Sequence, residues 1–212
     1  MKKILLILFL LLTLTILGMA LTYTSQYPPA QSGDYVKSTS LYSTDFNPWF
    51  CTDPALLLTG GVSNNCWLSK NGAAGYANNR FHIDLGSAKI IKRIYYENHH
   101  NSGAGTDQGV YNITFWGSNT GAGTFDDLVW ENDEGWTQLS IAQSTFDQHV
   151  ALNEADPKYI LVTNSTAYRY YAFKFADNYK AGDNYMGVRR IELQTEDGEE
   201  EVDNAIMMGF NF

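Results

Sequence analysis

Cysteine, proline and basic residues are all scarce in this chain of 212 residues. It contains 2 cysteines, 5 prolines and 14 lysines and arginines, against 23 aspartates and glutamates, which gives a formal net charge of -9. A chain of this sign repels the phosphates of nucleic acids and the headgroups of anionic lipids. The composition therefore argues against nucleic acid as a partner and against binding to a lipid surface.

Sequence motifs that carry catalysis are also missing. The chain has no His-Glu-x-x-His, no Gly-x-Ser-x-Gly, no phosphate-binding loop and no Cys-x-x-Cys. The acidic stretch from Asp126 to Glu134 could supply the paired carboxylates of a glycosidase, but such a run is more often a solvated hairpin tip. We therefore expect a protein that is not an enzyme.

A long hydrophobic run occurs at the N-terminus, where Met1-Lys2-Lys3 precedes an apolar stretch from Ile4 to Leu21. Gly18-Met19-Ala20 follows the small-x-small pattern of a signal-peptidase site, which predicts a secretory signal cleaved after Ala20. The run of about eighteen residues also reaches the lower limit for spanning a bilayer, so an uncleaved anchor is the alternative. In both cases we expect the rest of the chain to be extracellular.

The two cysteines, Cys51 and Cys66, predict a disulfide, because an even number of cysteines in an exported chain favours pairing. Two unpaired thiols are the alternative. Zinc binding is not expected, because structural zinc takes four ligands and the four histidines show no matching spacing.

Aromatic residues and glycine are plentiful, with 14 Tyr, 11 Phe, 5 Trp and 18 Gly. From Arg80 onward, short segments alternate apolar and polar residues between glycine and asparagine turns, as strands do. One short helix is expected from Asp53 to Gly60, because Asp53 can cap it and Pro54 suits its first turn. Strands without helices between them predict an all-β fold, an antiparallel β-sandwich of the jelly-roll type. The expected strands are 81–85, 111–115, 136–141, 159–162, 168–175 and 188–193.

The pattern divides the chain into four parts. Residues 1–20 form the signal, 21–38 a linker with Pro28-Pro29, 39–194 the sandwich, and 195–212 an acidic segment with an apolar C-terminal tail. Apolar residues alternate along the tail, which predicts a last strand or a tail packed on its own domain. The alternative is a docking strand for self-assembly.

Six motifs resemble, in the same order, those of the discoidin family, also called coagulation-factor type-C or galactose-binding-like domains. The resemblance covers residues 35 to 194 and implies a galactose-binding-like β-sandwich whose carbohydrate-binding members bind their ligand with loops at one end. The motifs are Phe81-His-Ile-Asp-Leu-Gly86, Lys89-Ile-Ile-Lys-Arg-Ile94, Tyr111-Asn-Ile-Thr-Phe-Trp-Gly-Ser-Asn-Thr-Gly121, Trp136-Thr-Gln-Leu139, Tyr168-Arg-Tyr-Tyr-Ala-Phe173 and Arg190-Ile-Glu-Leu193.

The resemblance also implies a structural calcium, which the carbohydrate-binding members hold with a loop and with the glutamate of the closing strand. Here the aspartate of that loop is missing, since the pair reads Gly60-Gly61, while Glu192 is in place. Asn64, Asn65 and backbone carbonyls could supply the remaining oxygen ligands. We therefore expect no required cofactor, and a structural calcium is the one candidate metal.

Sugar recognition needs an aromatic face and planar polar groups on loops that a stiff scaffold holds. The segment from Glu97 to Asn101 leaves the second matched strand at the end where the resembling modules bind ligands. The alternative is that the aromatic residues pack in the core or at its rim and that the histidines face water. The predicted ligand-binding residues are Trp49, Tyr76, Asn98, His99, His100, Asn101, Asn184 and Tyr185.

Two functions are compatible with these features. The first is a secreted, non-catalytic module that binds carbohydrate or a cell-surface glycoconjugate. The second is a structural appendage or envelope subunit that assembles through its terminal segments.

Overall fold

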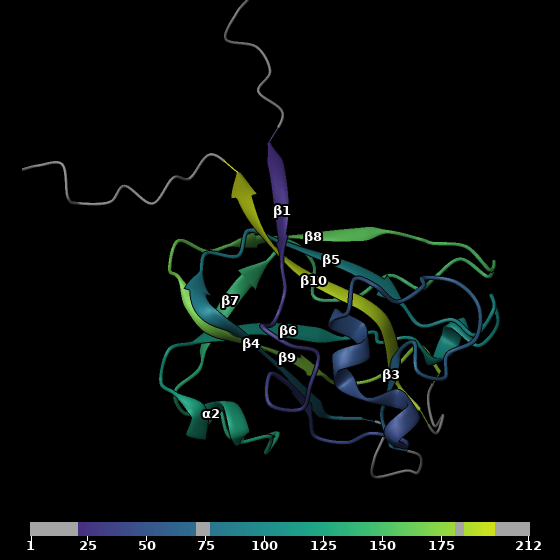
Figure 1. The fold of residues 1–212 in the computed structure, drawn as a ribbon, viewed down its shortest axis with the longest axis horizontal. Helices are drawn as coiled ribbons and strands as arrows, with labels where there is room; N and C mark the ends of the chain where they lie inside the picture. Colours follow the sequence, from purple (N-terminus) through teal and green to yellow (C-terminus); the bar gives the residue numbers. More distant parts are fainter. Residues whose placement is uncertain (1–20, 71–76, 181–184, 198–212) are drawn as a thin grey trace, which may run out of the picture. The chain divides into compact units, whose positions relative to one another are not determined.

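The computed structural model describes residues 21–70, 77–180 and 185–197, and these contain ten strands with a few short helical turns (Figure 1). The strands are β1 (Thr22–Gln26), β2 (Val36–Ser38), β3 (Trp67–Leu68), β4 (Asn79–Lys89), β5 (Arg93–Asn98), β6 (Ile113–Ser118), β7 (Thr137–Ile141), β8 (Lys158–Thr163), β9 (Tyr168–Phe175) and β10 (Gly187–Asp197). The helical turns are the 3-10 helices η1 (Thr44–Phe46), η2 (Pro48–Thr52) and η3 (Thr106–Gln108) and the α-helix α2 (Ala122–Asp126).

Contacts within the chain separate two units, of which Ser25–Thr195 carries the fold. The other unit contains both chain ends, and within it Thr24 Oγ1 donates to Asp197 Oδ1 at 2.7 Å. The expected signal and most of the C-terminal tail lie outside the described residues. In the part that is described, no helix combines the length and the apolar character needed to cross a membrane.

The strands form one curled sheet in the order β1-β10-β5-β8-β7-β6-β9-β4-β2, and β3 pairs with β10. Neighbours from β10 to β2 run antiparallel, and β7 pairs with both β8 and β6. This double pairing brings the two halves of the sheet face to face, with β8, β5 and β10 in one layer and β6, β9 and β4 in the other (Figure 1). The predicted all-β antiparallel sandwich is confirmed.

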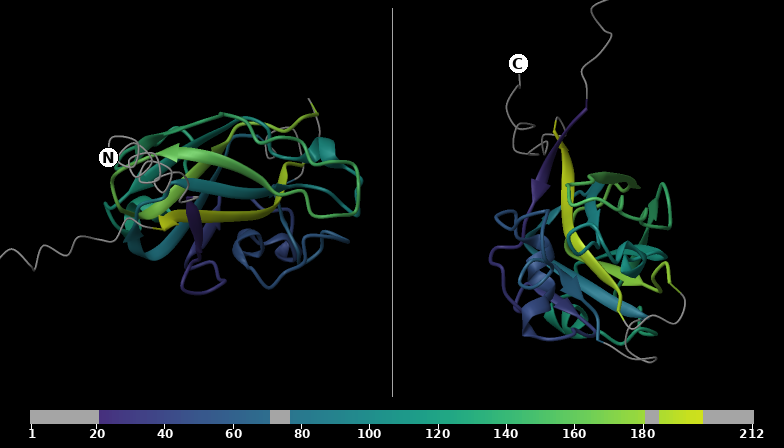
Figure 2. Two further views of the ribbon diagram at one scale, coloured as in Figure 1. Left: turned by 90° about the horizontal axis from the view of Figure 1, so that it is seen from above. Right: turned by 90° about the vertical axis from the view of Figure 1, so that its right-hand side faces the viewer.

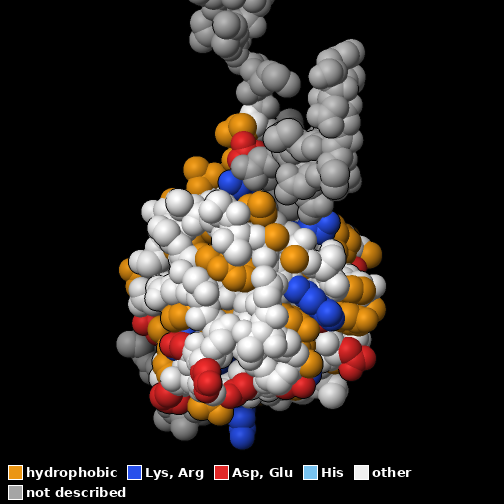
Figure 3. All heavy atoms as spheres, turned by 90° about the vertical axis from the view of Figure 1, so that its left-hand side faces the viewer, with side chains coloured by type: hydrophobic (Ala, Val, Ile, Leu, Met, Phe, Trp, Pro, Cys, Tyr) orange, Lys and Arg blue, Asp and Glu red, His pale blue; other side chains and the backbone are white. Residues whose placement is uncertain are grey.

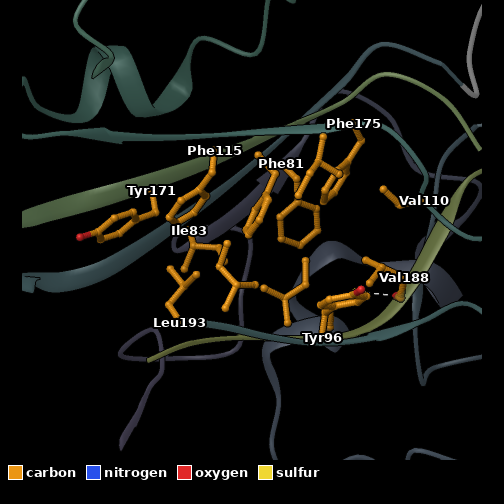
Figure 4. Packing of buried hydrophobic residues seen from close by; sticks show 14 of the residues in the cluster. Phe81, Ile83, Tyr96, Val110, Phe115, Tyr171, Phe175, Val188 and Leu193 are labelled. Carbon is orange, nitrogen blue, oxygen red and sulfur yellow. Dashed lines mark hydrogen bonds between the residues drawn. The ribbon is translucent and has the colours of Figure 1, made fainter. Parts of the chain in front are cut away.

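The layer with β4 and β9 carries most of the aromatic core, because every second side chain of these strands points into the interior. Phe81 and Ile83 of β4, like Tyr171, Phe173 and Phe175 of β9, are buried at 1 % exposure or less. Figure 4 shows Phe81, Phe115 and Phe175 pointing across the interior toward Tyr96, Val188 and Leu193 of the facing layer. Because both layers contribute large apolar groups, burial of this surface is the main force that holds them together.

The outer face of the same layer is covered by the connection between β6 and β7. Arg80 of β4 is fully buried there, and its Nη1 donates to Asn132 O at 2.6 Å and to Asp133 Oδ1 at 2.7 Å. Phe125 and Trp136 of the connection pack with Tyr170 and Ala172 in a second, smaller cluster. The partly apolar outer face of β9 therefore has a cover, as an inner strand requires.

Two expectations about local structure are wrong. The segment expected as a linker contains β1 and β2, which pair with β10 and β4. The helix expected from Asp53 to Gly60 is absent, although Asp53 Oδ1 does accept the Ala55 amide at 2.9 Å. The carbonyls that would continue such a helix instead accept hydrogen bonds from two arginines of β10, Arg189 and Arg190.

Cys51 and Cys66 are buried free thiols in the structure, so the predicted disulfide is not shown. Cys51 Sγ donates instead to Val188 O at 2.9 Å and accepts the Trp67 amide at 3.1 Å. Burial raises the pKa of the Cys66 thiol to about 12 and that of Cys51 well above its ordinary value. Both groups are therefore protonated and pack as small apolar side chains.

The core makes a prediction about stability. Phe173 packs against Phe115, Phe146 and Phe175, so Phe173→Ala should lower the free energy of unfolding by about 3–5 kcal/mol. The matched control is Leu161→Ala, because Leu161 of β8 is 55 % exposed and should cost less than about 0.5 kcal/mol. Urea denaturation measures both. Equal losses for the two variants would contradict the assigned core.

Candidate functional site

The predicted Asn98-His99-His100 segment begins at the last residue of β5 and lies in the interior. Asn98 is 1 % exposed, and its Nδ2 donates to Val110 O at 2.8 Å and to Asp147 O at 2.9 Å. Its Oδ1 accepts the His99 amide at 2.9 Å. The side chain thus joins three stretches of backbone, and its polar atoms are used in doing so.

The two histidines are also buried and hold loops together. His99 Nδ1 lies 3.0 Å from Gly105 O, and His100 Nε2 lies 2.9 Å from Leu58 O. Because a carbonyl only accepts, each of these ring nitrogens carries the proton, and His100 Nδ1 is then free to accept the Gly103 amide at 3.0 Å. The His100 ring stacks on His149, with centroids 3.9 Å apart.

Burial lowers the pKa of both His99 and His100 to about 4. They are therefore neutral near pH 7. The prediction that Asn98, His99 and His100 face a ligand is corrected by the structure, because their side chains are buried and their polar atoms already bind backbone groups. Asn101 is the one member of the segment that is exposed, at a turn where it and Ala104 exchange backbone hydrogen bonds.

An aromatic cluster at the start of β10 contains one of the predicted residues, Tyr185. The edge of the Tyr185 ring meets Tyr42 with centroids 5.1 Å apart, and Tyr42 meets Phe46 at 5.6 Å. Tyr42 is 46 % exposed, while Tyr185 and Phe46 are half-buried. The three rings form an aromatic surface that is open to solvent, and we call them the Tyr42 cluster.

The backbone around the Tyr42 cluster is firmly held. The Tyr42 amide donates to Leu68 O at 2.9 Å, the Ser69 amide donates to Met186 O at 2.8 Å, and Met186 N donates to Ser69 Oγ at 2.9 Å. Asn178 Nδ2 donates to the carbonyl of Tyr185. The backbone that carries Tyr42 and Tyr185 is thereby bonded to β3 and to the start of β10.

Exposed polar residues lie next to the Tyr42 cluster along the chain, or next to the backbone that is bonded to it. Thr44 and Asp45 are exposed on η1, whose first turn is capped by Ser43, and Lys70 is exposed two residues beyond β3. The combination of aromatic rings with a hydroxyl, a carboxylate and an ammonium group suits a ligand that has apolar faces and many hydroxyls.

Trp49, another of the predicted ligand-binding residues, makes no ring contact with this cluster in the part of the chain that the structure describes. Trp49 of η2 is half-buried and packs against the core, and its ring centroid lies 5.9 Å from that of Phe50. Tyr76 and Asn184 lie outside the described residues. Tyr42 and Phe46 were missed because a single tyrosine or phenylalanine between polar residues has no sequence signal that separates a surface ring from a buried one.

The predicted calcium ligands belong to two separate hydrogen-bond networks. Glu192 Oε2 accepts Ser25 Oγ at 2.6 Å, and its Oε1 lies 3.4 Å from Arg190 Nη1. The Asn64 amide donates to Asp45 O at 2.7 Å, and Asn65 Nδ2 lies 3.4 Å from Thr59 O. Within the described residues no hydrogen bond connects the two asparagines with the glutamate.

The acidic stretch lies in the β6–β7 connection, beside a cavity of about 200 Å³. Asp133 of this stretch forms ion pairs with Arg80 at 2.7 Å and with Lys174 at 3.0 Å. The Val129 amide and the Asn132 side chain lower the pKa of Asp127, which leaves this carboxyl poorly suited to donate a proton. Acidic side chains gather in the lower part of Figure 3, at the level of α2 in Figure 1. The cavity is lined by Thr120, Gly123, Thr124, Asp127, Asn132, Glu134, Gly135 and Trp136.

Comparison with solved structures identifies the fold. A family 32 carbohydrate-binding module from Clostridium perfringens NanJ, in complex with galactose, is matched with a TM-score of 0.52 and 12 % identity over 82 % of this chain and 100 % of that chain. The family 32 module CpGH89CBM32-5 from C. perfringens, in complex with GalNAc-β-1,3-galactose, matches with a TM-score of 0.50 and 13 % identity over 74 % of this chain and 92 % of that chain.

A third structure, the module CBM32-3 from a family 31 glycoside hydrolase of C. perfringens, matches with a TM-score of 0.50 and 18 % identity over 75 % of this chain and 88 % of that chain. No protein-family model and no curated protein matches the sequence. The chain therefore has the galactose-binding-like fold of family 32 carbohydrate-binding modules, and the resemblance seen in the sequence is confirmed at the level of fold.

The buried histidines make a prediction about pH. Below pH 6.5 the unfolded chain takes up protons that folded His99, with a pKa of about 4, does not, so the free energy of unfolding falls as the pH falls from 6.5 to 4. When the pH falls from 7.5 to 5.5, the free energy of unfolding of the wild type should fall by about 1 kcal/mol more than that of His99→Gln. Urea denaturation at the two pH values measures this difference.

The difference between the two proteins isolates His99, because the carboxylates and other histidines are the same in both. An identical loss in wild type and His99→Gln would contradict a neutral, buried His99.

Proposed function

We propose that this protein is a carbohydrate-binding module that recognises a glycan at the Tyr42 cluster and carries out no reaction. The single observation that carries the proposal is the ring pair of exposed Tyr42 and half-buried Tyr185, whose backbone is hydrogen-bonded beside the start of β10. The fold supports it, because structures with this fold include modules in complex with galactose and with GalNAc-β-1,3-galactose.

The chemistry of a sugar fits these groups. A pyranose ring presents patches of C–H bonds that pack on an aromatic ring, and hydroxyls that bind carboxylates, hydroxyls and ammonium groups. Tyr42 and Tyr185 meet nearly at right angles, with 85° between the ring planes, so a sugar can lie on one ring while the other limits its position. Asp45, Thr44 and Lys70 are the groups that would bind its hydroxyls.

The absence of a reaction is part of the proposal. Asp133 of the β6–β7 connection is engaged with Arg80 and Lys174, Asp126 is engaged with Lys37, and the sequence contains none of the catalytic motifs considered above. We further propose that the module acts outside the cell on a cell-surface or extracellular glycan, since the N-terminal sequence has the layout of a secretory signal.

The proposal predicts loss of binding when either tyrosine is removed. On a glycan array, and with immobilised galactose as a second probe, the wild type should bind at least one glycan. Tyr42→Ala and Tyr185→Ala should each weaken that binding by about tenfold or more, because a stacking partner worth about 1.4 kcal/mol is lost. A parallel assay for released sugar should find none.

The matched control is Tyr159→Ala, because Tyr159 is 50 % exposed on β8 and takes no part in the Tyr42 cluster. It should bind as the wild type does. Thermal unfolding confirms that each variant is folded. An array on which the wild type binds nothing, or equal binding by Tyr42→Ala and wild type, would overturn the proposal.

A further inference from the structure

A β-bulge in β10 directs Arg189 away from the regular ladder. Val188 pairs with Asn98 and Arg190 pairs with Glu97, so Arg189 is an extra residue between two consecutive partners on β5. An extra residue of this kind turns its side chain away from the normal alternation. The long, curved course of β10 is visible in yellow in Figure 2. The bulge sends the Arg189 guanidinium into the loop that follows η2.

Five backbone carbonyls converge on this guanidinium. Nη1 donates to Leu57 O at 3.3 Å and to Thr59 O at 3.0 Å. Nη2 donates to Gly60 O at 2.7 Å, and also to Gly61 O at 3.4 Å and His100 O at 2.8 Å. Arg190 Nη2 adds a bond to Leu56 O at 2.7 Å. Apart from Leu58 O, which His100 binds, the carbonyl oxygens from Leu56 to Gly61 therefore point at a positive charge.

The guanidinium is enclosed, since Arg189 is 1 % exposed. No acidic side chain of the described residues forms an ion pair with it, and the hydrogen bonds of Nη1 and Nη2 go to backbone carbonyls. Backbone carbonyl oxygens are also among the ligands with which proteins bind hard metal ions such as calcium. The Arg189 guanidinium therefore has surroundings that a metal ion can have in other proteins.

The loop does not fit calcium. Calcium binds about six to eight oxygens at about 2.3–2.6 Å, and here the inward carbonyls already accept hydrogen bonds from Arg189. Asn65 turns its Nδ2 toward Thr59 O and Gly61 O, which leaves its buried Oδ1 without a partner and as a single spare oxygen. Glu192, the expected carboxylate, is bound to Ser25 and Arg190.

We propose that the Arg189 guanidinium is the resident cation of this loop and takes the place of the structural calcium that the fold family implies. The consequence is a module whose stability and loop structure do not depend on calcium. This inference does not rest on glycan binding, because the groups that carry it lie in the loop from Leu56 to Asn65, at His100 and on β10.

The first experiment needs no variant. Thermal unfolding of the purified protein is followed in about 5 mM EDTA and in about 10 mM CaCl2, a concentration above the range of weak extracellular calcium sites. The melting temperatures in EDTA and in CaCl2 should agree within about 1 °C. A clear rise with calcium, or calcium binding by calorimetry, would overturn the proposal.

The second experiment is chemical rescue. Arg189→Ala should lower the melting temperature by about 5 °C or more, because it leaves a turn of buried carbonyls without donors. Millimolar ethylguanidinium, which can occupy the vacated cage, should recover part of the loss by mass action. Ethylammonium at the same concentration serves as the salt control and should recover less, because it lacks the planar fork of donors.

The matched control is Arg169→Ala, since Arg169 bonds to the carboxylate of Asp84 and its side chain is 43 % exposed. Ethylguanidinium should not raise its melting temperature. Equal responses of the two variants to ethylguanidinium would contradict a specific cage. If Arg189→Ala does not fold, Arg189→Lys replaces it, and a lysine variant as stable as the wild type in EDTA would contradict the need for a guanidinium fork.

Discussion

The hydrogen bonds between the buried Arg189 guanidinium and the carbonyls of the turn from Leu57 to Gly61 determine how this end of the sandwich is built. A guanidinium offers planar, directional donors, whereas a helix would have turned the same carbonyls along its axis. The turn therefore closes around the arginine. Because His100 O joins the same cage, the segment that leaves β5 is fixed to the turn as well.

This arrangement separates the side chains that hold the loops from the aromatic rings at which we propose that a glycan binds. Asn98, His99 and His100 lie beneath the surface and bind backbone atoms, and their burial keeps the histidines neutral. Tyr42 is exposed and Tyr185 is half-buried, and the backbone that carries both rings is hydrogen-bonded to neighbouring segments.

The sequence predicts the central strands of the molecule well, because their core residues occur at every second position. Tyr171, Phe173 and Phe175 alternate with Tyr170, Ala172 and Lys174, and the observed β9 has the bounds that this alternation predicts. The apolar pattern of Phe81 and Ile83 places β4 in the same way. In both strands the inward and outward sides are decided by local sequence alone, so no knowledge of distant contacts is needed.

The loops could not be predicted in this way, since their structure depends on partners far along the chain. Asp53-Pro54 is a sound start for a helix, but the arginines that capture the following carbonyls come some 130 positions later, as a bulge in another strand. His99 and His100 are polar residues in a loop, which suggested exposure, and their burial follows from contacts with Gly105 and Leu58. Whether Tyr42 is exposed likewise depends on which distant parts of the chain pack beside it, and the local sequence does not contain this information.

The most direct measurement is the two-dimensional ¹H–¹⁵N NMR spectrum of the purified protein during a calcium titration. If the Arg189 guanidinium occupies the loop, the amide signals of residues 57–61 and 98–104 keep their positions up to about 10 mM calcium, above the range of weak extracellular sites. Saturable shifts confined to these residues would show that a metal ion enters the turn and would contradict the account.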